Sequence, residues 1–237
     1  RSGESVVLVD DGSRIGGSLL FRSARIDGMP GANWLAAAEA DLRQLGVTVL
    51  TRTTAFGIYD HGLIALNQRR DDGPDRLWRV RPRRIVLAEG AVERPLPFAA
   101  NDLPGVMSAE AALGYLRRQA VLPGLRIVVA TNNSSTDEVA AAMTAAGAEV
   151  TVVDAREGRQ IARALGRRMV TGVVLEDGTR IPCDCVLVSG GFTATVHLHA
   201  QAKGRLRWDD ARLSFVPEAP VAGLVTVGAA AGHFALA

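Results

Sequence analysis

The sequence predicts an α/β protein built from two α/β units, and three observations carry this prediction. Residues 85–88 form a short apolar run rich in branched side chains, which is typical of a buried parallel strand. Pro95, Pro97 and Pro104 follow, in a stretch that cannot continue either a helix or a central strand. A new strand–helix–strand pattern begins beyond that stretch. The first unit therefore ends near residue 104, where the second begins.

The composition agrees with an α/β fold and excludes several classes of function. A chain of 237 residues, 48% hydrophobic and 5% aromatic, can hold one large or two small domains with ample core. The net charge of +2 and the few aromatic residues give no indication of nucleic-acid binding. No apolar run approaches the roughly 20 residues of a membrane span, and two cysteines make no secreted disulfide framework. We expect a soluble, cytoplasmic protein without nucleic-acid or membrane partners.

The first elements resemble the second half of a mononucleotide-binding unit. Residues 5–10 are an apolar run that ends in Asp10, followed by Asp11. An acid at the end of the second strand of such folds binds ribose hydroxyls, and a solvated turn acid is the alternative. Gly16 and Gly17 could lie along a ligand, because paired glycines allow close backbone approach, or could form a flexible loop. The first strand and the glycine-rich phosphate loop that normally precede this acid are expected to be missing, so the chain is a fragment or its beginning lies outside this sequence.

The remaining elements follow from periodicity and capping signals. Residues 33–45 predict a helix with Asn33 as its N-cap, and residues 108–119 a second helix that starts after Ser108. Residues 59–68 and 77–80 predict a hairpin. Further strands are expected as follows: 47–50, 127–130, 150–154, 169–175, 181–189 and the segment from 224.

The second unit lacks a glycine loop where one is expected. Residues 131–136 (TNNSST) stand between a strand and a helix at 137–146. They could offer backbone N–H groups to a phosphate or could form a capped structural turn. Asp154 would suit the ribose of NAD, and Arg156 would suit the 2′-phosphate of NADP. The two residues together therefore leave the choice between NAD and NADP open.

No catalytic or metal site is expected. Cys183 and Cys185 are two apart on the predicted strand 181–189 and share one face, and this is not the Cys-x-x-Cys spacing of a redox pair. We interpret both as buried, inert thiols. Only His197 and His199 suggest a metal, and no third ligand accompanies them. No nucleophile–base pair or carboxylate pair can be argued from spacing.

Four segments carry a resemblance to a known family: residues 9–20, 88–107, 128–133 and 189–198. They resemble the alpha subunit of heterotetrameric sarcosine oxidases and, more broadly, of flavin-linked opine and amino-acid dehydrogenases. The resemblance covers most of residues 6–234. It implies two Rossmann-like dinucleotide-binding domains (FAD/NAD(P)-binding, disulfide-reductase-like architecture), both incomplete. The first would comprise residues 1–104 and 218–237. The second, residues 105–217, would be shorter than in relatives by about one α/β unit after Asp154.

The same resemblance implies a bound dinucleotide, NAD as in sarcosine oxidases or FAD as in several dehydrogenase relatives. The residues expected to hold it lie in the first domain: Asp10, Asp11, Gly16, Gly17, Ala55, Ala88, Glu89, Gly90, Gly228 and Ala229. Glu89 stands where relatives usually have threonine. An acid beside a pyrophosphate is unfavourable, unless Glu89 points to solvent or pairs with Arg94.

The activity implied is that of a flavoenzyme complex with beta, gamma and delta subunits. Such a complex oxidatively demethylates sarcosine to glycine, transfers the one-carbon unit to tetrahydrofolate and yields hydrogen peroxide. One alternative is the alpha subunit of an FAD-dependent opine or amino-acid dehydrogenase, and another is a non-catalytic, degenerate scaffold. We expect that this chain alone performs no oxidation.

Overall fold

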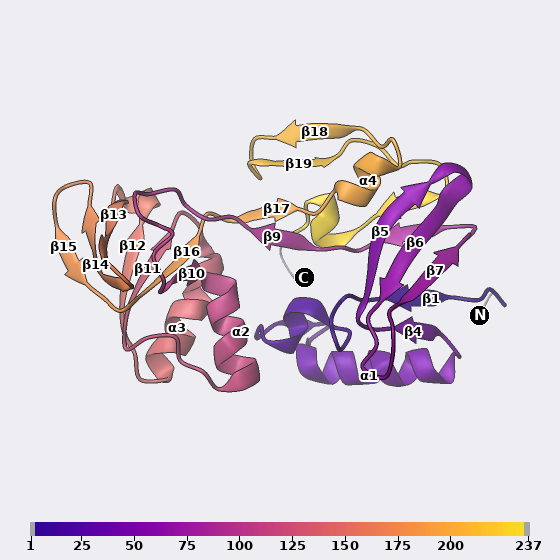
Figure 1. The fold of residues 1–237 in the computed structure, drawn as a ribbon, viewed down its shortest axis with the longest axis horizontal. Helices are drawn as coiled ribbons and strands as arrows, with labels where there is room; N and C mark the ends of the chain where they lie inside the picture. The colour runs from indigo at the N-terminus through magenta and orange to yellow at the C-terminus, as the bar shows by residue number, and fades with distance from the viewer. Residues whose placement is uncertain (1–2, 235–237) are drawn as a thin grey trace. The chain divides into compact units, whose positions relative to one another are not determined.

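The computed structural model describes residues 3–234 and divides the chain into two compact units (Figure 1). Unit 1 comprises the residues up to Ala91 together with those from Ala194 onward, and unit 2 comprises Val92–Thr193. Both units contain parallel strands and helices. The predicted α/β fold class is therefore confirmed.

Unit 1 contains two separate pairs of parallel strands. β1 (Val7–Val9) pairs with β4 (Thr48–Leu50), and α1 (Gly31–Gln44) connects them along the chain. β8 (Ile85–Leu87) pairs with β20 (Leu224–Thr226). An antiparallel sheet of three strands follows β4 in the chain: β5 (Thr53–Tyr59), β6 (Leu63–Gln68) and β7 (Arg76–Val80). Two smaller antiparallel pairs complete the unit: β2 (Arg25–Ile26) with β3 (Met29–Pro30), and β18 (Leu206–Asp209) with β19 (Ser214–Pro217).

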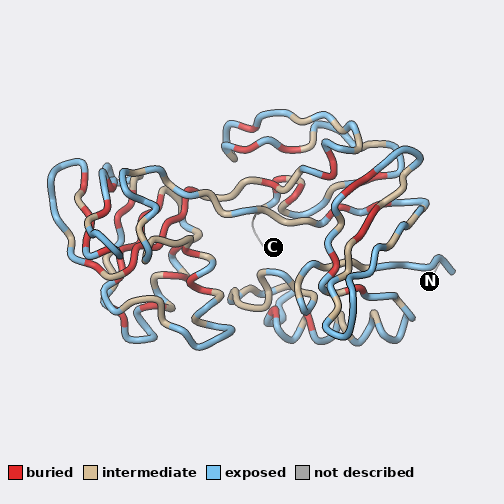
Figure 2. The backbone as a smooth tube through the Cα atoms, in the orientation of Figure 1, coloured by how far each residue is buried: buried red, intermediate tan, exposed pale blue. Residues whose placement is uncertain are grey.

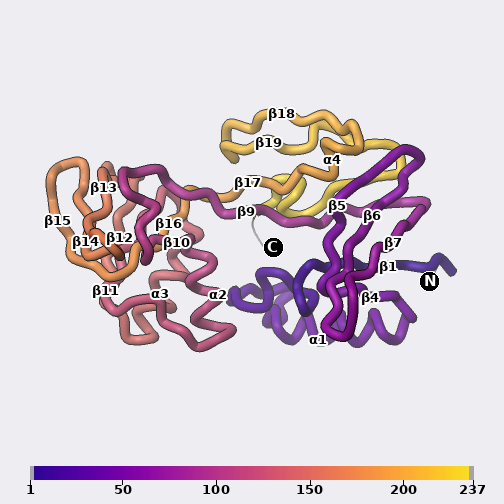
Figure 3. The backbone as a smooth tube through the Cα atoms, in the orientation of Figure 1, coloured from indigo at the N-terminus to yellow at the C-terminus, as the bar shows by residue number. Residues whose placement is uncertain are grey.

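The last part of the chain belongs to unit 1, where it packs against strands from the first half of the sequence (Figure 3). In α4 (His197–Gln201), Leu198 is buried with four residues from three strands: Ile58, Ile85, Leu87 and Leu224. The Ile58 amide donates to Gln201 Oε1 over 2.9 Å. Because these contacts join β5, α4 and β20, the C-terminal segment completes the core of the first unit.

Unit 2 is built on a four-stranded parallel sheet. Its strands lie in the order β10 (Val106–Ser108), β16 (Cys185–Ser189), β11 (Arg126–Thr131) and β12 (Glu149–Asp154). Every residue of β16 is buried, as expected for a central parallel strand, and buried residues gather along this sheet in Figure 2. Two helices, α2 (Ala109–Gln119) and α3 (Asp137–Ala145), pack on each other and on the sheet. An antiparallel sheet joins β13 (Ile161–Gly166), β14 (Val170–Leu175) and β15 (Arg180–Pro182).

The chain passes between the units through two strands that pair with each other, β9 (Ala91–Glu93) and β17 (Phe192–Ala194). The sequence places the boundaries at residues 104 and 218, whereas the compact units divide at residues 91 and 194. Residues 92–104 lie with unit 2, where the Ala99 amide donates to the Ala162 carbonyl over 3.0 Å.

Three local predictions differ from the structure. α1 begins at Gly31 after Pro30, so Asn33 lies inside the helix and is not its N-cap. A strand, β13, occupies half of the span 157–168, where none is predicted. The predicted strand 181–189 is divided into β15, which pairs with β14, and β16, which pairs with β10 and β11. Asp184 lies between them, and its Oδ1 accepts hydrogen bonds from the Leu125 and Arg126 amides, each over 3.0 Å.

Ser108 caps α2 as predicted, accepting a hydrogen bond from the Ala111 amide over 3.3 Å. Among the helices of residues 3–234, none is long and apolar enough to cross a membrane.

Candidate functional site

The carboxyl ends of β8 and β20 bring half of the predicted cofactor-binding residues together. Leu87 and Thr226 are partners in the parallel register, and the Val227 amide donates to the Leu87 carbonyl over 2.9 Å. Ala88, Glu89 and Gly90 therefore leave the sheet at the same edge as Gly228 and Ala229. Ligands of open α/β sheets bind outside the carboxyl ends of the strands.

Two glycines leave room at this edge. Gly90 has a φ of +76° and Gly228 a φ of +62°, a left-handed conformation that favours glycine. A Cβ atom added at either position would meet no heavy atom within 4 Å. The backbone is thus open to close approach by a ligand, which fits a dinucleotide at this edge.

Glu89 places an acid at this edge, and one of its carboxylate oxygens is sealed from solvent. Oε2 is buried and has no hydrogen-bond partner among the described residues. Burial raises the pKa of the Glu89 carboxyl to about 7. The sequence allows that Glu89 points to solvent, and the burial of Oε2 contradicts this alternative. Arg94 donates from Nε and Nη2 to the Gly190 carbonyl over 3.2 and 3.0 Å.

The two acids predicted to bind ribose lie at the end of β1. Asp10 makes three hydrogen bonds. Its amide donates to the Leu50 carbonyl, and its carbonyl accepts from the Thr53 amide. Its Oδ1 accepts from the Gly12 amide over 2.8 Å. Asp11 is exposed. Asp10 is therefore a turn-capping acid in a fixed position, and its role toward a ribose stays a prediction.

The other predicted residues of unit 1 differ in what their positions allow. Ala55 lies in β5, partly buried against the core cluster that contains Leu87. Gly16 packs against α1, where an added Cβ would lie 2.6 Å from a methyl group of Leu35. Close packing thus accounts for Gly16 without a ligand. Gly17, with a φ of +52°, has open space beside it.

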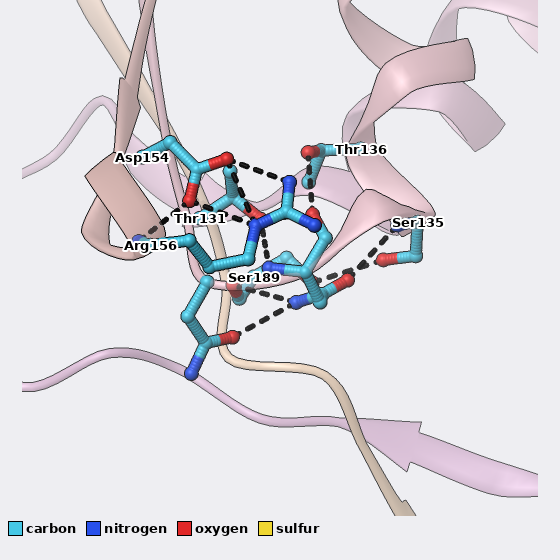
Figure 4. Close-up of polar contacts among 8 residues, drawn as sticks. Thr131, Ser135, Thr136, Asp154, Arg156 and Ser189 are labelled. Carbon is cyan, nitrogen blue, oxygen red and sulfur yellow. Dashed lines mark hydrogen bonds and ion pairs between the residues drawn. The ribbon is translucent and has the colours of Figure 1, made fainter.

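In unit 2, polar side chains at the ends of β11 and β16 bind one another (Figure 4). Thr131 Oγ1 donates to the Asn133 carbonyl over 2.8 Å, and Asn133 Oδ1 accepts from the Ser135 amide over 3.0 Å. Asn133 Nδ2 donates to the Ser189 carbonyl over 3.2 Å, and the hydroxyls of Ser135 and Ser189 are 3.3 Å apart. These contacts are those of a capped structural turn.

Asp154 and Arg156, the residues that could choose between NAD and NADP, are paired with each other. Arg156 Nη2 lies 2.6 Å from Asp154 Oδ2, and the Arg156 amide donates to Asp154 Oδ1 over 2.9 Å. Hydrogen bonding from Arg156 lowers the pKa of the Asp154 carboxyl. A nucleotide would have to compete with this pair for either side chain.

His199, which the sequence does not assign to cofactor binding, contacts Thr226 at the carboxyl end of β20. The buried ring of His199 lies 3.1 Å from Thr226 Oγ1 through Nδ1 and 3.3 Å from the Arg205 carbonyl through Nε2. Gly204 is required beside it, because an added Cβ would lie 2.2 Å from the ring. His197 is exposed. No local pattern distinguishes such a buried histidine from a metal ligand.

Cys183 and Cys185 are both buried, as predicted, although they do not share one strand. Burial, with the nearby charge of Asp184, raises the pKa of Cys183 to about 11 and that of Cys185 to about 12. At pH 8 only about one Cys183 thiol in a thousand is then ionised, against roughly a quarter in an unfolded chain.

We therefore expect iodoacetamide at pH 8 to modify both cysteines at least about a hundredfold more slowly in the folded protein than after unfolding in guanidinium. Mass spectrometry of the peptide that carries both residues measures the two rates. Equal rates before and after unfolding would show that one thiol is accessible and ionised, as in a redox pair.

No family model matches the chain. Among solved structures, L-proline dehydrogenase from P. horikoshii is similar to 95% of this chain and 46% of its own, with a TM-score of 0.81 and 22% identity. A NAD-dependent persulfide reductase from A. fulgidus is similar to 96% of this chain and 49% of its own, with a TM-score of 0.68 and 17% identity. This chain therefore shares the fold of the matching parts of these two enzymes.

Comparison with curated proteins identifies more similar relatives than these solved structures. The alpha subunit of sarcosine oxidase from Corynebacterium sp. (strain P-1) is 38% identical over 275 residues, covering 99% of this chain and 28% of the relative. The corresponding protein of Rhizobium meliloti (strain 1021) is 35% identical over 265 residues, covering 100% of this chain and 27% of the relative. This chain is thus homologous to one part of sarcosine oxidase alpha subunits, which confirms the resemblance expected from the sequence. It spans less than a third of their length.

Proposed function

We propose that this chain is the dinucleotide-binding region of a sarcosine oxidase alpha subunit. The whole enzyme would be a cytoplasmic flavoenzyme complex with beta, gamma and delta subunits. It would demethylate sarcosine to glycine and pass the one-carbon unit to tetrahydrofolate. The region itself would bind the cofactor and contribute no catalytic acid or base.

The observation that carries this proposal is the similarity over nearly the whole chain to alpha subunits named for sarcosine oxidation. The open, glycine-lined edge of β8 and β20 supports a dinucleotide there. Asp10, Asp11, Gly17 and Ala55 would serve the same cofactor from β1 and β5. NAD is our first choice of cofactor, with FAD as the alternative.

A second candidate is one component of an opine or amino-acid dehydrogenase. An opine oxidase component from Rhizobium meliloti (strain 1021) is 28% identical over 136 residues, covering 54% of this chain and 28% of the relative. Its lower identity and coverage favour the sarcosine oxidase proposal.

The test is to purify the full-length subunit with the partners that copurify and to assay hydrogen peroxide formed from sarcosine and from an opine. Acid release followed by chromatography identifies the bound dinucleotide. We expect sarcosine-dependent peroxide, about one dinucleotide per chain, and no turnover by residues 1–237 alone. Turnover with the opine only would favour the second candidate. Absence of any bound or bindable dinucleotide would favour a non-catalytic scaffold.

A further inference from the structure

We propose that Glu89 binds the dinucleotide as a neutral carboxylic acid and donates a hydrogen bond to one of its phosphate oxygens. This inference rests on the proposed function. It gives a role to Glu89, whose negative charge would be unfavourable beside a phosphate. Binding would then take up one proton from solution, provided that Glu89 is ionised beforehand. The dinucleotide affinity of this region would depend on pH for that reason.

The placement of Glu89 is the first step of the argument. It lies just after β8, between Ala88 and Gly90, at the edge where Gly228 leaves β20. Gly90 and Gly228 both have positive φ and open space beside them. Backbone of this kind lets a phosphate approach closely, as glycines do in phosphate-binding loops.

The second step is the unsatisfied oxygen. Buried carboxylate oxygens are normally hydrogen-bonded, and those without a partner need an explanation such as an absent ligand. Oε2 of Glu89 is sealed from solvent and finds no hydrogen-bond donor within residues 3–234. The rest of the residue is only partly buried, so a ligand at the open edge would supply that partner once the Glu89 side chain turns toward it.

The third step is the protonation state. The elements packed with β8 are β20, β5, β6 and α4, and their titratable side chains are Tyr59, His197 and His199. Tyr59 and His197 are exposed, and both ring nitrogens of His199 are hydrogen-bonded elsewhere. Burial alone accounts for the pKa of about 7 at Glu89. A phosphate repels an ionised carboxylate and favours the protonated acid, which has an O–H to donate.

The sign of the pH dependence follows from this state. Below pH 7 the acid already carries its proton, so binding takes up none. Above pH 7 a proton must be added, so the apparent affinity falls by about tenfold between pH 6 and pH 8, because each pH unit above the pKa reduces the protonated fraction tenfold. Proton uptake at pH 8 should approach one per dinucleotide.

Isothermal titration of the full-length subunit with NAD, and separately with FAD, measures both quantities. Titrations at pH 6 and pH 8 in two buffers of different ionisation enthalpy give the number of protons taken up. Glu89→Gln keeps a donor and cannot ionise, so its affinity should be equal at the two pH values, without proton uptake. Glu218→Gln, an exposed position of the same unit, should retain the wild-type behaviour.

Several outcomes overturn the proposal. Proton release on binding at pH 6, with affinity rising toward pH 8, would mean that Glu89 accepts a hydrogen bond as a carboxylate, for example from a ribose hydroxyl. Unchanged proton uptake in Glu89→Gln would assign the titration to another group. Binding without any proton exchange leaves the proposed function standing and removes this inference. If neither dinucleotide binds wild type or variant, the proposed function itself fails.

Discussion

Replacing Gly228 with valine is expected to weaken NAD or FAD binding by about a hundredfold, equivalent to about 2.7 kcal/mol. The branched side chain would fill the open space beside Gly228, where the backbone is expected to approach the cofactor. The φ of +62° adds backbone strain of roughly 1–2 kcal/mol for any residue with a Cβ atom. The dissociation constant of the full-length subunit, measured by titration, gives the effect on binding, and thermal unfolding gives the effect of strain.

Gly223 supplies a matched control for that strain. It precedes β20 at its amino end, has a φ of +74°, and an added Cβ would make only an ordinary contact, 3.7 Å from the Arg83 carbonyl. Gly223→Val should therefore lower the unfolding temperature about as much as Gly228→Val and leave the dinucleotide affinity unchanged. Equal losses of affinity in both variants would place the cofactor away from the carboxyl ends of β8 and β20.

Replacing Leu187 with alanine is expected to destabilise unit 2 by about 2–5 kcal/mol. Leu187 is fully buried in β16, which has a neighbouring strand on each side, and its register partners are Met107 and Val129. The loss combines the transfer of the removed methyl groups with the cavity that remains. Amide hydrogen exchange of β11 and β16 should become faster by about 30-fold or more.

The control for this change is Val152→Ala on β12, at the edge of the same sheet. Val152 is 42% exposed, so its truncation should leave exchange in β11 and β16 within about threefold of wild type. Comparable acceleration by both variants would indicate that β16 is not the centre of the cooperative core.

The elements that the sequence predicts well are those whose signals are local. Ser108 marks the start of α2 because its side chain accepts a hydrogen bond from the amide of Ala111, in the first turn of the helix. An N-cap residue of this kind can be recognised in the sequence. The apolar run at residues 127–130 predicts β11 for the same reason. The predicted α/β class needs no more than such signals.

The missed features depend on contacts distant in sequence. The run 181–189 divides because its first part pairs with β14 and its second part with β10 and β11, and no local pattern indicates this change of sheet. The burial of Glu89 Oε2 likewise has no signal in the residues around it. The sequence predicts which residues of the candidate site lie near a strand end. Tertiary packing decides that Gly16 lies against Leu35 and that one carboxylate oxygen of Glu89 is buried.

The interleaved order of the two units also constrains how a nascent chain can fold. β20 is the strand partner of β8 in the described structure, yet the ribosome synthesises all of unit 2 between them. Unit 2 is one continuous segment, so it can fold as soon as it emerges. Unit 1 must wait with the edge of β8 unpaired until residue 226 has been made. Exposed strand edges of this kind pair readily with other chains, so slow translation after residue 193 prolongs the period in which the growing protein is vulnerable to aggregation.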